Sequence, residues 1–454
     1  MSDLDKIFKA YDVRGVVPEE IDESVAEAVG AAFVRLTGTK TLVTLHDMRA
    51  TSGPLAEALG RGAAAQGAEV IHGGLGSTDM AYYASGYLDI PGAMITASHN
   101  PAKYNGIKLC KAGAKPVGIE TGLAEIRQLV ESGVPAFDGP AGRVTGKDLL
   151  PGYADYLRKL VDLSGIRPLT VVVDAGNGMG GYTVPTVFEG LPVTLVPLYF
   201  ELDGSFPNHE ANPIDPENLR DLQRAVLAHQ ADIGLAFDGD ADRCFVVDER
   251  GEIVSPSVLT AMITSRELAR EPGATVIHNL ITSRAVPEII AEHGGTPVRT
   301  RVGHSFIKAK MAETNAIFGG EHSGHFYFRD FWFADSGMLA ALHTLAALGY
   351  DDRPLSAILG DFSRYAASGE INSEVADQAA TAQRVKAVYG AQPGVVTDEL
   401  DGLTVSGDTW WFNLRPSNTE PLLRLNVEAA DAVEMAAVRD EVLGIVRGPA
   451  AHQQ

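Results

Sequence analysis

A buried strand that ends in a row of aspartates limits the fold of this chain more than any other segment. The apolar run 233–237 predicts a buried strand, and Asp238, Asp240 and Asp242 follow it directly. Because the side chains of an extended segment alternate between two sides, we expect the three carboxylates to converge on one point. Converging carboxylates repel one another unless a cation lies between them. A hard divalent ion fits these oxygen ligands, and Mg²⁺ is preferred if a phosphate completes the site.

Two other interpretations of the aspartate run compete with the magnesium site. A solvated acidic turn would use the same residues without an ion. A calcium-binding loop would place Asp at positions 1, 3 and 5 and Glu249 at position 12. That loop needs glycine at its sixth position, which is Arg243 here, and helices on both sides, where this chain has strand-like segments. We therefore reject the calcium loop.

The composition is that of a globular chain with several domains. With 454 residues, of which 45% are apolar and 21% charged, the chain is too long for a single core. The formal net charge of −22 argues against nucleic acid or an anionic membrane as a partner, so an anionic substrate would need a locally basic pocket. No apolar run is long enough to cross a bilayer, and the N-terminus lacks the features of a signal peptide. We expect Cys110 and Cys244 to be free thiols in a reducing cytoplasm.

Alternating strand and helix patterns predict an α/β fold. Three consecutive units of similar size suggest a repeated architecture, although the residues themselves show no strong repeat. From about residue 365 onward, alternating strands and two helices indicate a small α+β unit. The predicted domains are 1–150, 151–250, 251–364 and 365–454.

A second functional segment follows the strand predicted near residues 93–96. Ser98 lies on a tight loop there and could be an exposed nucleophile, although a lone serine in such a loop is more often a helix cap or an ST-turn. The pair Asn105-Gly106 is typical of a turn. We therefore predict that the chain folds back and brings Lys108 close to Ser98; an exposed strand lysine is the alternative.

Two further polar segments complete the set. Glu321, Ser323 and His325 alternate between glycines and suit the hydroxyl groups of a polar small molecule, or else form a surface turn. Residues 415–421, with Arg424 nearby, combine arginines with short donor side chains and suit an anion, although a polar loop has the same composition. Each segment alone has an ordinary explanation. Together, carboxylates for Mg²⁺, a serine at a strand end with a lysine, a loop suited to sugar hydroxyls and a loop suited to phosphate form one chemical set.

These motifs occur in the order found in the α-D-phosphohexomutases, and the chain most closely resembles their bacterial phosphomannomutase/phosphoglucomutase branch. The resemblance extends from the motif 11–15 (Tyr-Asp-Val-Arg-Gly) to Arg424, nearly the full length. It implies three related α/β domains with mixed sheets and a fourth α+β domain, similar to the TATA-binding protein, around a central cleft. It also implies interconversion of hexose 1-phosphate and hexose 6-phosphate, with mannose or glucose as the sugar. A phosphoserine enzyme and hexose 1,6-bisphosphate, as activator and intermediate, would carry this reaction.

The resemblance also assigns roles to residues. Ser98 would carry the phosphate and share one Mg²⁺ with Asp238, Asp240 and Asp242. Lys108 matches a general acid or base, His325 is a second candidate base, and Arg243 would help to position the phosphoserine. The residues expected to bind the sugar phosphate are Tyr11, Arg14, His304, Glu321, Ser323, His325, Arg415, Ser417, Asn418, Thr419 and Arg424.

One segment departs from the family pattern. Many members have a lysine at the position that Ile281 occupies here. Arg284 or Arg301 would be candidates to replace it. The departure leaves the preferred sugar open.

Other functions remain as alternatives. Phosphoglucosamine mutase is the nearest rival within the family, and a non-catalytic sugar-phosphate-binding paralogue is a second, although such a paralogue would be expected to lose Ser98 or the aspartates. The run 176–181 also fits the G-x-G-x-x-G pattern of dinucleotide-binding proteins, which is weak evidence alone. We expect sugar phosphates as the small-molecule partners, and a monomer or homodimer.

Overall fold

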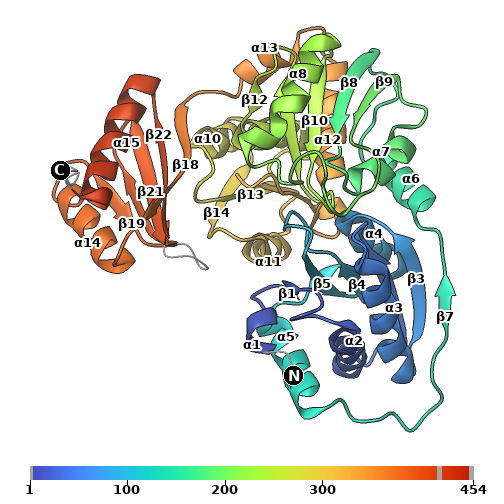
Figure 1. Cartoon of the computed structure of the whole chain (residues 1–454). Helices are drawn as coiled ribbons and strands as arrows, with labels where there is room; N and C mark the ends of the chain where they lie inside the picture. The colour runs from blue at the N-terminus through green and yellow to red at the C-terminus, as the bar shows by residue number, and fades with distance from the viewer. Residues whose placement is uncertain (1–3, 417–421, 449–454) are drawn as a thin grey trace.

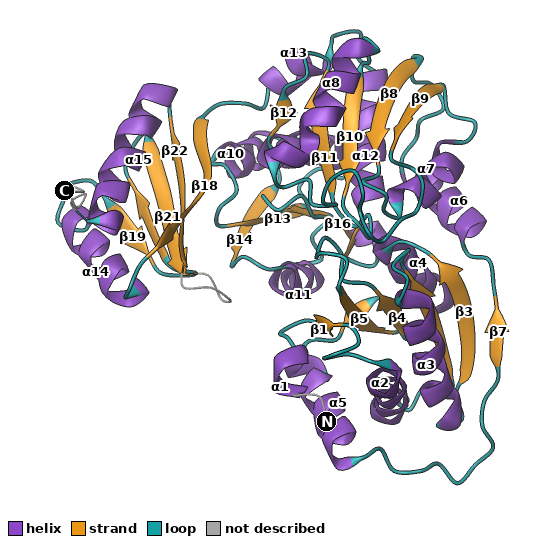
Figure 2. Cartoon of the chain, viewed as in Figure 1, coloured by secondary structure: helices purple, strands orange, loops and turns teal. Residues whose placement is uncertain are grey.

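The computed structural model describes residues 4–416 and 422–448. These residues form four sheets, three of them in α/β units and one in a C-terminal unit that lies to one side (Figure 1). Figure 2 shows how helices and strands alternate through the first three units. The predicted α/β class is confirmed. None of the described helices is long and apolar enough to span a bilayer.

The first unit contains a mixed seven-stranded sheet. Helix α2 shows how local sequence sets an element's ends, because the Asp22 side chain accepts a hydrogen bond from the Val25 N–H at its start and Gly38 takes a left-handed conformation at its end. The strands are β1 (Val13–Val16), β2 (Thr41–His46), β3 (Glu69–Leu75), β4 (Gly92–Ile95), β5 (Tyr104–Lys111), β6 (Lys115–Pro116) and β7 (Val144–Gly146). The helices are α1 (Leu4–Ile7), α2 (Glu23–Thr37), α3 (Ser52–Ala65), α4 (Thr78–Leu88), η1 (Ile119–Thr121) and α5 (Leu123–Ser132).

The second and third units each contain a five-stranded mixed sheet. The second contains α6 (Leu150–Leu160), β8 (Leu169–Asp174), α7 (Gly180–Phe188), β9 (Val193–Leu198), η2 (Pro216–Leu219), α8 (Arg220–Ala228), β10 (Ile233–Phe237), β11 (Cys244–Asp248) and β12 (Ile253–Val254). The third contains α9 (Pro256–Arg270), β13 (Thr275–Asn279), α10 (Ala285–Glu292), β14 (Thr296–Thr300), α11 (His304–Thr314), β15 (Phe318–Gly320), β16 (Phe326–Phe328), η3 (Arg329–Phe331), β17 (Ala334–Asp335), α12 (Gly337–Gly349) and α13 (Leu355–Gly360).

The three α/β units share one strand order. The order is β3-β2-β4-β5-β1 in the first, β9-β8-β10-β11-β12 in the second and β14-β13-β15-β16-β17 in the third. In each, the first three strands are parallel and the last two pair antiparallel. The predicted repeat is therefore present in the topology, although the residues do not display it.

This shared order places three of the predicted functional segments at equivalent positions. Ser98 lies between β4 and β5, the aspartate run lies between β10 and β11, and His325 ends the loop between β15 and β16. In every unit this loop follows the last parallel strand. Such loops at the carboxyl ends of parallel strands are where α/β proteins place their binding sites.

The fourth unit is a five-stranded antiparallel sheet with two helices. It has its own apolar core, whereas one apolar cluster includes side chains of all three α/β units. Its elements are β18 (Ala366–Glu374), α14 (Gln378–Tyr389), β19 (Val396–Asp398), β20 (Leu403–Ser406), β21 (Trp410–Pro416), β22 (Leu422–Ala429) and α15 (Ala432–Arg447). The separate core lets this unit act as a body distinct from the other three.

Asp79 joins side chains from all three α/β units. The side chain is fully buried and accepts hydrogen bonds from Ser77 of its own loop, from Tyr153 at 2.7 Å and from Ser336 at 2.6 Å. Burial, opposed by these hydroxyl donors, raises the pKa of Asp79 to about 6.

This raised pKa predicts a pH-dependent stability. An unfolded aspartate titrates near 3.8, so between pH 4 and 6 the folded chain binds a proton that the unfolded chain releases. The contribution of Asp79 to the free energy of unfolding is therefore full below about pH 4 and falls as the pH rises through 6. We expect the stability advantage of wild type over Asp79→Asn to be about 3 kcal/mol larger at pH 4 than at pH 7 in metal-free urea titrations. A pH-independent difference would contradict this assignment.

Candidate functional site

The three aspartates of the loop between β10 and β11 lie together. One carboxylate oxygen from each of Asp238, Asp240 and Asp242 is within 4.8 Å of the others, and all three side chains are buried. Among the described residues, the Oδ1 atoms of Asp240 and Asp242 are buried without a hydrogen-bond partner. Buried oxygens with unused lone pairs and a hard donor set fit a divalent cation such as Mg²⁺.

The backbone reaches this arrangement by a turn rather than an extended segment. The Ala241 N–H donates to the Asp238 carbonyl at 3.0 Å, and Ala241 has a positive φ of 58°. Our reason for the convergence, alternation along a strand, is therefore wrong. The three carboxylates converge within this turn.

Two cations from the chain contact the carboxylates. The Arg243 Nε donates to Asp238 Oδ2 at 2.9 Å, and Lys108 Nζ donates to Asp240 at 2.7 Å and to Asp242 at 2.8 Å. Burial raises the pKa of Asp238 to about 7, although Arg243 opposes the shift. Burial also acts on Asp240, but the Lys108 ammonium outweighs it and lowers the pKa of that carboxyl. With Asp238 ionised, the three carboxylates outnumber the two cations, so the cluster then has a net negative charge.

Ser98 lies directly against this cluster. Its Oγ donates to Asp238 Oδ2 at 2.8 Å, although the two residues are 140 positions apart in the sequence. The serine is 5% exposed and has a positive φ of 51°, a conformation that non-glycine residues seldom adopt. Strained backbone of this kind concentrates at functional sites. The position against the carboxylates distinguishes Ser98 from an ordinary turn serine.

Arg49, which the sequence analysis missed, holds the serine loop in place. Its buried guanidinium donates to the backbone carbonyls of Ser98 at 2.8 Å and Asn100 at 2.7 Å, and to those of Pro101 and Tyr104 at 3.0 Å. The Arg49 Nε pairs with the buried carboxylate of Asp47 at 3.2 Å. The signal was a pair of charged residues, Asp47 and Arg49, just after the apolar strand β2.

A glycine permits the serine loop and the aspartate loop to touch. A Cβ on Gly239 would lie 2.4 Å from the Ser98 carbonyl oxygen. On its other side, the Gly239 carbonyl accepts from the Met179 N–H at 2.9 Å, and a Cβ on Gly178 would lie 2.7 Å from the same oxygen. The G-x-G-x-x-G run thus supports the aspartate loop by close backbone packing, which gives these glycines a structural role.

Gly239→Ala should therefore damage the site more than a typical surface substitution. The added methyl group would push Ser98 away from the carboxylates, and a displacement of about 1 Å can lower a rate by roughly 100-fold. We expect a loss of that order in kcat, measured against Gly444→Ala, where a Cβ meets no atom within 4 Å. Wild-type kcat in Gly239→Ala would show that the close approach is unnecessary.

Lys108 reaches the cluster from β5, but not by the predicted turn. Asn105 and Gly106 lie inside that strand and pair with β1, so the predicted Asn-Gly turn is wrong. The strand β5 runs antiparallel beside β4, which precedes Ser98, and this pairing carries Lys108 to Asp240 and Asp242. Burial acts to lower the pKa of Lys108, but the two carboxylates outweigh it and raise the pKa well above its usual value. Lys108 therefore holds its proton in this arrangement.

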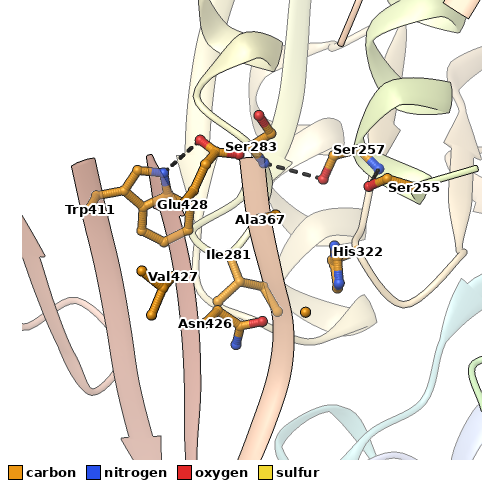
Figure 3. Close-up of a pocket in the computed structure, with 11 residues that line it drawn as sticks. Ser255, Ser257, Ile281, Ser283, His322, Ala367, Trp411, Asn426, Val427 and Glu428 are labelled. Atoms are coloured by element: carbon orange, nitrogen blue, oxygen red, sulfur yellow. Dashed lines mark hydrogen bonds between the residues drawn. The ribbon is translucent and has the colours of Figure 1, made fainter. Parts of the chain in front are cut away.

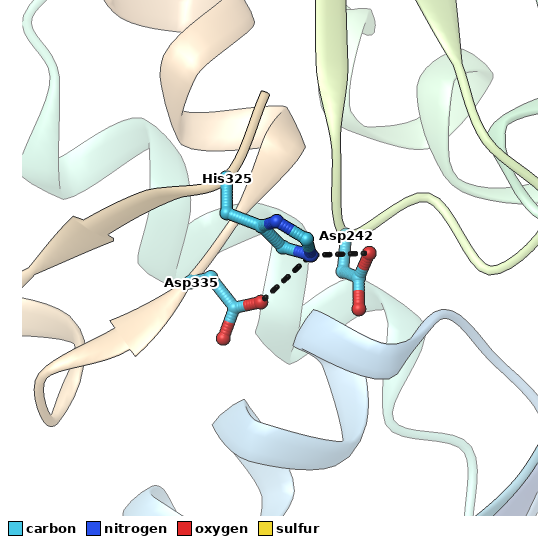
Figure 4. Close-up of side chains that lie close together, drawn as sticks. All are labelled: Asp242, His325 and Asp335. Atoms are coloured by element: carbon cyan, nitrogen blue, oxygen red, sulfur yellow. Dashed lines mark ion pairs between the residues drawn. The ribbon is translucent and has the colours of Figure 1, made fainter. Parts of the chain in front are cut away.

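His325 links the sugar-type loop to the same cluster. Its Nε2 is 3.7 Å from Asp242 and 4.0 Å from Asp335 (Figure 4). Its Nδ1 is 2.9 Å from Ser323 Oγ, and Ser323 donates its hydroxyl proton to Glu321 at 2.7 Å. Since Ser323 has only one proton, it accepts from His325, so Nδ1 carries the hydrogen and Nε2 faces the carboxylates. Burial acts to lower the pKa of His325, but Glu321, Asp242 and Asp335 outweigh it and raise that pKa, so Nε2 is the nitrogen that gains or loses a proton as His325 titrates.

The opening motif contacts both the serine loop and the third unit. Arg14 donates to the Asn100 side chain at 2.6 Å and pairs with Asp12. The Tyr11 hydroxyl lies against Gly303, where an added Cβ would be 3.2 Å away. These contacts place Arg14 beside the serine loop and Tyr11 at the border between the first and third units. The side chain of His304, which follows Gly303, lies outside the described residues.

The predicted anion-binding segment is in the fourth unit. Arg415 and Arg424 are opposite each other on β21 and β22, and both contact Glu370. Ser417, Asn418 and Thr419 lie outside the described residues. Their part in an anion site therefore stays a prediction.

Comparisons with known proteins match the whole chain to one family. The four domain models of phosphoglucomutase/phosphomannomutase match residues 5–135 (alpha/beta/alpha domain I), 151–251 (domain II), 256–365 (domain III) and 370–445 (C-terminal domain). The "Phosphohexose mutases" protein of Xanthomonas campestris is 40% identical over 97% of this chain and 99% of the relative. This chain belongs to the phosphoglucomutase/phosphomannomutase family.

Two other members of the family agree with this assignment. A phosphomannomutase of Escherichia coli is 39% identical over 97% of this chain and 99% of its own length. The crystal structure of a phosphoglucomutase/phosphomannomutase family protein from Burkholderia thailandensis has a TM-score of 0.89 and 32% identity, and the match covers 100% of this chain and 99% of that one. The predicted resemblance to the phosphohexomutases is confirmed.

Ile281, the residue that departs from the family pattern, lies between the third and fourth units. Ile281 faces a small pocket with His322 and Asn426, close to Trp411 and Glu428 (Figure 3). The candidate substitute Arg284 instead donates to the backbone carbonyls of the turn 407–410, at 3.0–3.2 Å. The Arg284 guanidinium therefore binds a turn of the fourth unit. The guanidinium of Arg301 lies over the Phe306 ring, 5.1 Å from its centre.

Proposed function

We propose that this phosphohexomutase interconverts hexose 1-phosphate and hexose 6-phosphate, with mannose or glucose as the sugar, through a phosphoserine at Ser98 and a hexose 1,6-bisphosphate. As a member of its family, the chain is an intramolecular phosphotransferase, an isomerase. The observation that carries the proposal is the 2.8 Å hydrogen bond from Ser98 Oγ to Asp238, at the edge of three converged carboxylates. A nucleophile at this position could share a cation with those carboxylates once phosphorylated.

The metal ligands in this proposal are Asp238, Asp240, Asp242 and a phosphate oxygen on Ser98. The unused buried Oδ1 atoms of Asp240 and Asp242 fit a hard cation, and Mg²⁺ would neutralise charge on the transferring phosphoryl group. Arg243, already paired with Asp238, would orient the phosphate from the protein side.

In the first step the bond between phosphorus and Ser98 Oγ breaks and a bond from phosphorus to the sugar's 6-oxygen forms. The 6-hydroxyl proton passes to a base, and Ser98 is left to be protonated. The bisphosphate then turns and returns its C1 phosphate to Ser98, which leaves hexose 6-phosphate. Positioning and charge stabilisation supply most of the rate enhancement in such transfers.

Lys108 and His325 are the two candidates for the proton transfers. Lys108 keeps its proton next to two carboxylates and suits the acid, which would reprotonate Ser98. In its neutral form His325 would accept the hydroxyl proton at Nε2, the nitrogen that faces Asp242 and Asp335, and so suits the base. We therefore propose His325 as base and Lys108 as acid in the first transfer.

The remaining sites would hold the sugar phosphate. Arg415 and Arg424, with Ser417, Asn418 and Thr419, would bind the phosphate that does not react. Glu321, Ser323 and His304 would contact sugar hydroxyls, and Tyr11 and Arg14 would complete the pocket from the first unit. We also propose a cytoplasmic enzyme that is a monomer or homodimer.

The direct test is ³¹P NMR of the purified chain with Mg²⁺, a trace of glucose 1,6-bisphosphate and one hexose 1-phosphate at a time. We expect mannose 1-phosphate and glucose 1-phosphate to convert to their 6-phosphates. Faster conversion of glucosamine 1-phosphate would make the chain a phosphoglucosamine mutase. No conversion of any of the three by a folded chain would favour the non-catalytic sugar-phosphate-binding protein.

A further inference from the structure

Glu370 lies between the two arginines of the proposed phosphate site. Its Oε2 accepts a hydrogen bond from Arg415 Nη2 at 2.8 Å, and its Oε1 is 3.4 Å from Arg424 Nη1. The side chains of Glu370 and Arg415 are 28% and 13% exposed. One carboxylate therefore contacts both guanidinium groups from a partly enclosed position, where charge interactions are stronger than on an open surface.

Strand pairing explains why the three residues meet. Arg415 and Arg424 face each other across β21 and β22, and like charges in such a pair destabilise a sheet. On the other side of β22, Asn372 of β18 is the partner of Arg424. Glu370 is two residues before Asn372 and so points to the same face. A carboxylate at this place relieves the repulsion between the arginines.

A bulge in β18 supports this placement. The register of β18 against β22 shifts between Ala367 and Glu370, and Gly369 has a positive φ of 69° there. Bulges of this kind redirect a side chain and recur beside functional sites. Glu370 follows the bulge directly, so the irregular backbone and the shared carboxylate occur at one point.

We infer that Glu370 is a built-in counter-ion of the phosphate site, which pairs with Arg415 and Arg424 when no phosphate is bound and weakens phosphate binding when one arrives. This inference rests on the proposed function. A phosphate dianion would have to share the guanidinium groups with a carboxylate of the same sign or displace it. Glu370 thereby sets how tightly the fourth unit holds a phosphate.

The proposed reaction needs such weakening. Within each turnover, the site must release one phosphate of the bisphosphate and then bind the other. Arginines with no counter-ion would hold either phosphate tightly and slow this exchange. A carboxylate that pairs again with the arginines as the phosphate departs favours release. Glu370 therefore lowers the affinity for phosphate and raises the turnover rate.

The test compares Glu370→Gln with wild type, because Gln keeps the shape and one acceptor but removes the charge. Glu374→Gln is the matched control, since Glu374 is an exposed glutamate on the same strand. We expect calorimetric titrations to show Glu370→Gln binding glucose 6-phosphate and inorganic phosphate about fivefold to tenfold more tightly than wild type. In turnover assays, KM and kcat should both fall. The control should stay within about twofold of wild type in every measurement.

Unchanged or weaker phosphate binding by folded Glu370→Gln overturns the counter-ion, because it would mean that Glu370 only orients the arginines. If Glu370→Gln folds poorly, Glu370→Ala is the second variant, and we expect it also to bind phosphate more tightly than wild type. Failure of the proposed function is a separate result, in which wild type does not turn over any hexose phosphate. The titration with inorganic phosphate still decides the counter-ion in that case, since it needs no turnover.

Discussion

Asp240→Asn should lose about 1,000-fold in kcat while the fold is kept. Asp240 is buried at the centre of the carboxylate cluster, where its Oδ2 accepts from Lys108 and from Thr78 at 2.5 Å and its Oδ1 is unused. The amide keeps a hydrogen bond with Thr78 but removes one of the three charges that would hold Mg²⁺. Weaker binding of the cation that would stabilise the transferring phosphoryl group reduces rates by factors of this order.

The measurement is steady-state turnover of glucose 1-phosphate over a series of Mg²⁺ concentrations, with circular dichroism to verify the fold. Asp352→Asn, which removes an exposed charge, is the control. Lys108 still pairs with Asp242 in the variant, so we expect only a modest change in melting temperature. A rate within tenfold of wild type would remove Asp240 from the metal site.

Arg49→Met should have the largest effect on stability of any single substitution discussed. It removes four hydrogen bonds to the serine loop and leaves the buried carboxylate of Asp47 without its cation. Breaking a buried ion pair from one side destabilises a protein by about 3–5 kcal/mol. The free energy of unfolding in urea should fall by that amount, whereas Arg143→Met, at an 85% exposed side chain, should change it little.

Arg49→Lys separates the structural role from the functional one. A lysine keeps the positive charge next to Asp47 but cannot donate to four carbonyls at once. We expect this variant to recover much of the stability but to remain at least tenfold slower than wild type, because Ser98 is no longer held against Asp238. Wild-type kcat in Arg49→Lys would show that the serine loop does not need the guanidinium.

The sequence predicted the fold class and the grouping of the main motifs because their signals are local. An apolar run followed by carboxylates, or a serine after a strand, can be recognised within ten residues. Contacts between residues far apart in the sequence could not be found in this way. Arg49 reaches Ser98, and Asp79 reaches Ser336, only through the tertiary arrangement.

Two local predictions failed because the wider structure overrode the local signal. Asn105-Gly106 is a strong turn pair, but pairing of β5 with β1 and β4 on its two sides keeps it extended. The aspartates converge through a turn, in which the Ala241 N–H donates to the Asp238 carbonyl and Gly239 packs against Ser98. In both cases the residues that meet were expected, while the backbone path between them was not.

The most direct test of this account is peptide mass spectrometry of Ser98 after incubation with glucose 1,6-bisphosphate and Mg²⁺. We predict one phosphate on the peptide that contains Ser98, and its loss when mannose 1-phosphate or glucose 1-phosphate is added. The Ser98→Ala chain should carry no phosphate on that peptide and show no turnover. A folded wild-type chain that turns over hexose phosphates without ever carrying phosphate on Ser98 would contradict the account.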